Sequence, residues 1–193
     1  MNPSSQISNL DFKKVLTPEN IRVLRIIFLA LAAGVFTFGL VILIIYFQQT
    51  HSDYNEVMTP TLNLLSVMNL IFALTSIVLG KFMYDRQFQT ATIEIQKSSG
   101  VSNSKVVANN LSTAEKCLAT IRTASIIRLA MLEGSALLGL VVTLLAVQSG
   151  AGNQAPMYFL NALTTLPLFI TIVIIFPTAD RLEQIFQEKI FKR

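Results

Sequence analysis

The sequence predicts an all-α membrane protein: a four-transmembrane-helix bundle with a cytoplasmic helical extension between helices 2 and 3 and a C-terminal amphipathic helix. The first observation is composition, because 52% of the residues are hydrophobic and only 13% are charged, against roughly a quarter charged in soluble domains. The second is the presence of four apolar runs, each long enough to cross a hydrocarbon layer about 30 Å thick as a helix. The third is that the fifteen Lys and Arg residues are confined to the N-terminal region, one connection and the C-terminal tail.

The limits of the spans follow from these apolar runs. The predicted spans are residues 23–47, 60–84, 123–148 and 157–177. Residues 18–193 form the membrane domain, and residues 1–17 are a cytoplasmic tail for which no order is predicted. The first helix should begin at Thr17-Pro18-Glu19, where a hydroxyl can cap the helix and proline takes the first helical position.

The long connection, residues 85–122, is predicted to be a cytoplasmic helical hairpin. The second helix should continue beyond its span until Gly100, which offers a C-terminal stop. Ser112-Thr-Ala-Glu115 matches a capping box, in which the two side chains satisfy free amides of a new helix. The third helix is therefore predicted to start near Thr113.

The fourth span contains Pro167, which should kink the helix and release carbonyls that Asn161 or Thr164 could occupy. Residues 178–193 follow Pro177 and alternate apolar and charged positions at helical spacing. Such a helix suits the membrane interface or a partner protein. Its predicted apolar face consists of Leu182, Ile185, Phe186 and Ile190.

The charges also predict an orientation and exclude some classes of site. Under the positive-inside rule, both termini and the hairpin lie in the cytoplasm, and the loops around His51 and Gly150 lie outside. The net charge of +4 is dispersed, which argues against nucleic acid as a partner. Cys117 is the sole cysteine and His51 the sole histidine, so neither a disulfide nor a metal or other cofactor is predicted.

Glu133 is the one ionisable residue within residues 129–147. A carboxylate there costs roughly 2.5 to 3.5 kcal/mol on insertion scales, so it should face other helices and have a partner. Thr75, Ser76 and Thr171 are predicted at the same depth, with Arg25 one turn below. Arg128 should point away from Glu133 and snorkel to the headgroups. Asn69, near the middle of the second helix, is predicted to bond another helix or to line a pore.

Small residues at four-residue spacing predict which helices approach most closely. Such spacings let helix backbones come together, and they point to the first and third helices as the tight pair. The residues concerned are Ala30 with Gly34, Ala130 with Gly134, and Ser135 with Gly139.

Two roles for Glu133 remain open at this stage, beside a trivial one at the inner headgroups. In one, a protonated or hydrogen-bonded carboxyl fixes the packing of the bundle. In the other, it takes up and releases a proton or cation. No nucleophile–base pair, phosphate-binding glycine loop or carboxylate cluster predicts an enzyme. We therefore expect a structural or accessory subunit of a homo-oligomer or larger membrane complex, with the hairpin and tail as contact surfaces, or a proton- or cation-translocating element built on Glu133.

The third span resembles the carboxylate helix of the rotary ATPase proteolipid, the c subunit. That pattern is an alanine, the ion-binding glutamate, and a glycine six residues later followed by Leu-Val-Val. The matching residues are Ala130, Glu133, Gly139, Leu140, Val141 and Val142. The resemblance implies that Glu133 carries an ion. The chain departs from the family in lacking its glycine-repeat helix and in carrying the carboxylate on a third helix.

The chain is also similar to small bacterial inner-membrane proteins with four spans. Their third span reads Ile-Ile-Arg-x-Ala-x-x-Glu-Gly-x-Ala-Leu, as residues 126–137 do, and their last span ends in a proline before a charged amphipathic tail, as residues 177–193 do. This similarity implies a multi-pass protein of the bacterial inner membrane, and it brings no activity with it.

Overall fold

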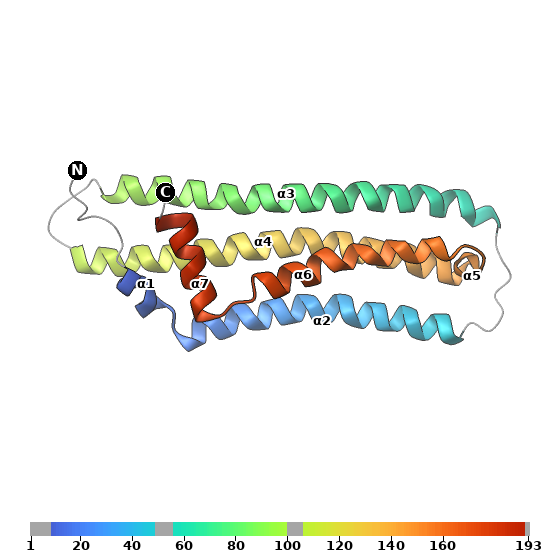
Figure 1. Cartoon of the computed structure of the whole chain (residues 1–193), viewed down its shortest axis with the longest axis horizontal. Helices are drawn as coiled ribbons and strands as arrows, with labels where there is room; N and C mark the ends of the chain where they lie inside the picture. The colour runs from blue at the N-terminus through green and yellow to red at the C-terminus, as the bar shows by residue number, and fades with distance from the viewer. Residues whose placement is uncertain (1–8, 49–55, 100–105, 192–193) are drawn as a thin grey trace. The chain divides into compact units, whose positions relative to one another are not determined.

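A computed structural model describes residues 9–48, 56–99 and 106–191 (Figure 1). Within these ranges 94% of the residues are helical and none forms a strand, which confirms the all-α class. Four helical stretches are long and apolar enough to cross a membrane. They are Pro18–Gln48, Glu56–Thr90, Ser112–Gln148 and Pro156–Ile174.

The helical elements vary widely in length. In chain order they are α1 (Asn9–Val15), α2 (Pro18–Gln48), the 3₁₀ helix η1 (Glu56–Met58), α3 (Thr59–Ser99), α4 (Val106–Gln148), α5 (Ala151–Gln154), the 3₁₀ helix η2 (Pro156–Thr165), α6 (Leu166–Ile174), α7 (Ala179–Phe186) and the π-helix η3 (Gln187–Phe191). The long helices α2, α3 and α4 each contribute residues to both compact units of the chain.

The chain forms two compact units. Unit 1 comprises Met1–Phe28, Lys81–Arg128 and Ile175–Arg193, and unit 2 comprises Leu29–Gly80 and Leu129–Ile174. The segments of unit 2 contain no Lys or Arg, so all fifteen basic residues belong to the segments of unit 1. Among the described large apolar side chains that are exposed, all but Val23, Ile26 and Phe82 belong to unit 2. Unit 2 thus has the surface of a membrane-embedded bundle.

The predicted starts of α2 and α3 are confirmed. The Thr17 hydroxyl accepts the Asn20 amide at 3.3 Å, and the Thr17 carbonyl accepts the Ile21 amide at 3.2 Å. Thr17 is therefore the N-cap of α2, with Pro18 at its first position. Helix α3 begins at Thr59, has Pro60 in its first turn, and continues to Ser99 as predicted.

The prediction that a capping box starts the third helix is wrong. Helix α4 begins at Val106, so Ser112 and Glu115 lie inside it. A helix that has started gains one hydrogen bond for each residue that it adds, and residues 106–111 contain neither Gly nor Pro to oppose it. The local motif is therefore overridden by continuation of the helix.

The fourth span is two helices of different type instead of one kinked α-helix. Residues Pro156–Thr165 form η2, and Pro167 lies in the first turn of α6, the part of a helix that tolerates proline best. A 3₁₀ helix rises about 2.0 Å per residue against 1.5 Å in an α-helix. This 19-residue span therefore reaches about 33 Å, whereas an α-helix of the same length would reach about 28 Å.

Within unit 1, both ends of the described chain are docked, contrary to prediction. The ring of Phe12 on α1 stacks on Phe186 of α7, with centroids 4.1 Å apart, and both side chains are buried. Lys13 and Glu183 join the same two helices by an ion pair of 3.2 Å. The apolar face predicted to meet the membrane or a partner is therefore buried in unit 1 through Leu182, Ile185 and Phe186. Ile190 has no described side chain, so that part of the prediction lies outside the described residues.

Candidate functional site

Glu133 lies on α4 in unit 2, where its side chain is half-buried. Gly34 of α2 lies near this carboxyl, since a methyl group added to Gly34 would be 4.0 Å from Glu133 Oε1. The carboxyl thus lies beside a position of α2 that carries no side chain.

The side chains predicted to pair with Glu133 are engaged elsewhere or unpaired. The exposed Thr75 hydroxyl donates to the Ile71 carbonyl of its own helix at 2.8 Å. Ser76 is fully buried, and its Oγ has no hydrogen-bond partner among the described residues. Thr171 is buried as well. Within the described part of unit 2, the carboxylate of Glu133 has no hydrogen-bond partner of its own.

The two predicted arginines belong to unit 1. Arg25 Nε donates to the Pro177 carbonyl at 2.9 Å, and its guanidinium lies 5.9 Å from the ring centroid of Phe176. Arg128 lies over the ring of Tyr84 at 5.4 Å. Both arginines therefore organise the side chains of unit 1 around aromatic rings.

Small, exposed residues lie near Glu133 in the sequence of α4 and, on α2, at Gly34 and four residues before it. Ala30 and Gly34 of α2 and Ala130 and Gly134 of α4 are all exposed, and we call these four residues the small-residue patch. A methyl group on Gly134 would approach Phe72 of α3, 3.8 Å away, so this glycine faces α3 and not α2. The predicted approach of the first and third helices therefore holds at Gly34, which lies beside Glu133 of α4, but not at Gly134.

The tightest approach of α4 is to the fourth span, through Ser135 and Gly139. A methyl group on Gly139 would collide with Thr164 Oγ1 and the Asn161 carbonyl, and would lie 3.1 Å from Asn69 Nδ2. The Thr164 hydroxyl also donates to the Ser135 carbonyl at 3.3 Å. The predicted role of these two residues in joining the first and third helices is thus corrected: they join α4 to η2.

A polar network joins α3 to η2 inside unit 2. Asn69 Nδ2 donates to Asn161 Oδ1 at 3.1 Å, and Asn161 Nδ2 donates to Ser66 Oγ at 2.9 Å. The Tyr158 hydroxyl donates to Asn63 Oδ1 at 2.8 Å. Asn69 is 1% exposed, and its Oδ1 has no partner among the described residues.

The 3₁₀ geometry of η2 accounts for this network. Tyr158, Asn161 and Thr164 are three residues apart, and a 3₁₀ helix has three residues per turn, so the three side chains lie on one line. In an α-helix the same spacing would rotate them progressively around the axis. The sequence analysis predicted a role for Asn69 but missed Tyr158. The alignment of Tyr158 with Asn161 and Thr164 depends on a 3₁₀ helix, and hydrophobic periodicity does not distinguish this helix type.

No protein family, curated protein or solved structure matches this chain. The residues described by the structure hold no group of three His, Cys, Asp or Glu side chains arranged to bind a metal ion. The candidate site consists of Glu133 and the small-residue patch.

Proposed function

We propose that this chain is an integral membrane protein that acts as a structural or accessory subunit, packing in a homo-oligomer or in a larger membrane complex. One observation carries the proposal: Glu133 is half-buried, has no hydrogen-bond partner within the described part of unit 2, and borders the exposed small-residue patch. A carboxylate facing lipid is costly, and a donor from another subunit would remove that cost. Small residues at this surface favour the close approach of another helix.

The proposed location is the bacterial inner membrane, with both termini in the cytoplasm. The confinement of all Lys and Arg residues to the three segments of unit 1 supports this orientation. It is tested by labelling single cysteines in intact cells, with Cys117 replaced by Ser. His51→Cys should react from outside, and Lys14→Cys should react only after permeabilisation. Reaction of both from the same side would overturn the topology.

Assembly is tested by adding bulk to the small-residue patch. Ala130→Leu and Ala30→Leu should reduce the mass of the particle purified in mild detergent, because a leucine keeps the partner helix away. Val173→Phe is the matched control, since Val173 is 76% exposed on α6 and lies outside the patch. If all three variants keep the parent's mass, the patch is not an assembly surface.

The same unpartnered carboxyl supports a second candidate function, the translocation of a proton or cation by Glu133. This role predicts a flux in proteoliposomes that Glu133→Gln abolishes while assembly stays intact. The subunit role predicts no flux in the parent protein. The two measurements together therefore separate the candidates.

A further inference from the structure

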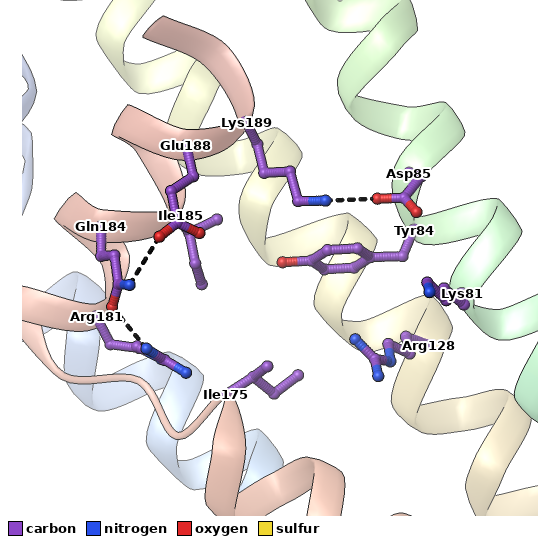
Figure 2. Close-up of a pocket in the computed structure, with 10 residues that line it drawn as sticks. All are labelled: Lys81, Tyr84, Asp85, Arg128, Ile175, Arg181, Gln184, Ile185, Glu188 and Lys189. Carbon is purple, nitrogen blue, oxygen red and sulfur yellow. Dashed lines mark hydrogen bonds and ion pairs between the residues drawn. The ribbon is translucent and has the colours of Figure 1, made fainter. Parts of the chain in front are cut away.

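Unit 1 contains an open pocket of about 220 Å³ whose walls come from α3, α4 and the α7–η3 segment (Figure 2). Tyr84 points into the space between these elements. Lys189 of η3 forms an ion pair of 2.7 Å with Asp85 of α3 across one side, and Arg128 of α4 lies on the other side of the ring. The pocket is thus a polar site distinct from Glu133.

The charges of the pocket do not balance. Four cations line it, Lys81, Arg128, Arg181 and Lys189, against the two acids Asp85 and Glu188, so four minus two leaves a formal charge of +2. Asp85 already forms an ion pair with Lys189.

The other acid and one further cation are also engaged, since Arg181 Nη1 donates to Gln184 Oε1 at 2.6 Å. Glu188 accepts a hydrogen bond from Gln184 Nε2 at 2.8 Å. Within the described part of unit 1, neither Lys81 nor Arg128 has an ion pair or a side-chain hydrogen bond. These two cations are therefore available to an anion.

The sequence positions of these residues indicate the source of the anion. Lys81 directly follows the segment without Lys or Arg that ends at Gly80, and Arg128 directly precedes the one that begins at Leu129. Ile175, a third lining residue, is the first residue after unit 2's last segment. Cations just beyond an apolar span reach the level of the lipid phosphates, and basic pockets at that level bind acidic headgroups.

We propose that this pocket binds the phosphate of an anionic phospholipid headgroup, with the Arg128 guanidinium and the Lys81 ammonium as donors. The planar guanidinium offers two parallel N–H groups to a pair of phosphate oxygens, and the ammonium supplies a second positive charge. A lipid is favoured over a soluble phosphate because its acyl chains hold the headgroup at the membrane surface, where its local concentration is high.

The test measures the unfolding temperature of the full-length protein in detergent, using a dye that fluoresces on reaction with the buried thiol of Cys117. The added probes are phosphatidylglycerol, phosphatidylcholine and inorganic phosphate. Phosphatidylglycerol should stabilise the parent protein at lower concentrations than the other two. The double variant Lys81→Gln/Arg128→Gln should bind phosphatidylglycerol with an affinity lower by a factor of about ten or more.

The matched control is Arg86→Gln/Lys116→Gln, which removes the same charge from exposed positions of unit 1 outside the pocket. It should keep the parent's affinity. Lys81→Gln alone guards against misfolding of the double variant, because Lys81 is exposed; it should show part of the loss. Equal affinity in the parent and the pocket variants, or equal loss in the control, would overturn the proposal. Equal stabilisation by inorganic phosphate would overturn the assignment to a lipid.

Discussion

Asn69 on α3 and Asn161 on η2 are 92 residues apart in the chain, and their side-chain amides meet at 3.1 Å in the interior of unit 2. Asn161 also donates to Ser66, so one side chain bonds α3 twice. The alternative to such pairing in a membrane is a polar group facing hydrocarbon. The amide pair therefore specifies which face of η2 meets α3.

Replacing Asn161 by Leu should lower the free energy of unfolding by about 1 to 2 kcal/mol, because the buried Asn69 and the half-buried Ser66 lose their partner. The measurement is the midpoint of unfolding in a denaturing detergent titration. Thr75→Val is the control, because this exposed hydroxyl bonds only its own helix, and its midpoint should stay near the parent's. Equal midpoints for all three proteins would show that the network adds no stability.

Two glycines of α4 should differ in their tolerance of an added methyl group. Gly139→Ala should destabilise unit 2 by roughly 1 to 3 kcal/mol, as overpacked cores do, because the backbone carbonyl of Asn161 blocks the new methyl. Gly134→Ala should be tolerated, since its nearest neighbour is a carbon of Phe72 at 3.8 Å. The same detergent titration measures both. A tolerated Gly139→Ala would mean that α4 and η2 are less closely packed than described.

Phe12→Ala should release α1 from α7. The lost ring is fully buried and stacked on Phe186, and Phe→Ala changes in cores typically cost about 3 to 5 kcal/mol. Hydrogen exchange of the α1 amides should therefore become fast. Lys14→Ala, which removes only an exposed ion pair with Asp11, should leave exchange unchanged. Slow exchange of α1 in Phe12→Ala would contradict its docking through this ring.

The thiol of Cys117 should resist maleimide in the native protein and react at once after denaturation, because the side chain is fully buried in unit 1. A cysteine at the exposed position Ser112, in a Cys117→Ser background, should react in the native state. Mass spectrometry of the labelled proteins measures both. Rapid labelling of native Cys117 would contradict the burial of this face of α4.

Local signals and long apolar runs predicted much of the fold. Thr17 and Pro18 mark the start of α2 because capping and proline geometry act within a few residues. Ser112 failed as a helix start because an equally local motif is overruled once a helix has begun further upstream.

The tertiary consequences of apolar residues were harder to predict. Phe12 and Val15 are at helical spacing, but a helix of seven residues is too short for this pattern to indicate which residue the Phe12 ring would meet. Gly34 was correctly singled out as a small residue, yet the spacing rule does not say whether such a residue faces a helix of the same chain or an open surface. That distinction decides the proposed role of Glu133.

The most direct test of the proposed subunit role is photo-crosslinking in native membranes from a reactive residue placed at Ala130. The proposal predicts a crosslinked product at a defined mass, either twice that of the chain or that of a fixed complex, which disappears in the added variant Ala30→Leu. A reactive residue at Val173, exposed on α6, serves as the comparison and should give no such product. Crosslinks only to lipid at both positions, with Ala130 behaving like Val173, would contradict an assembly surface beside Glu133.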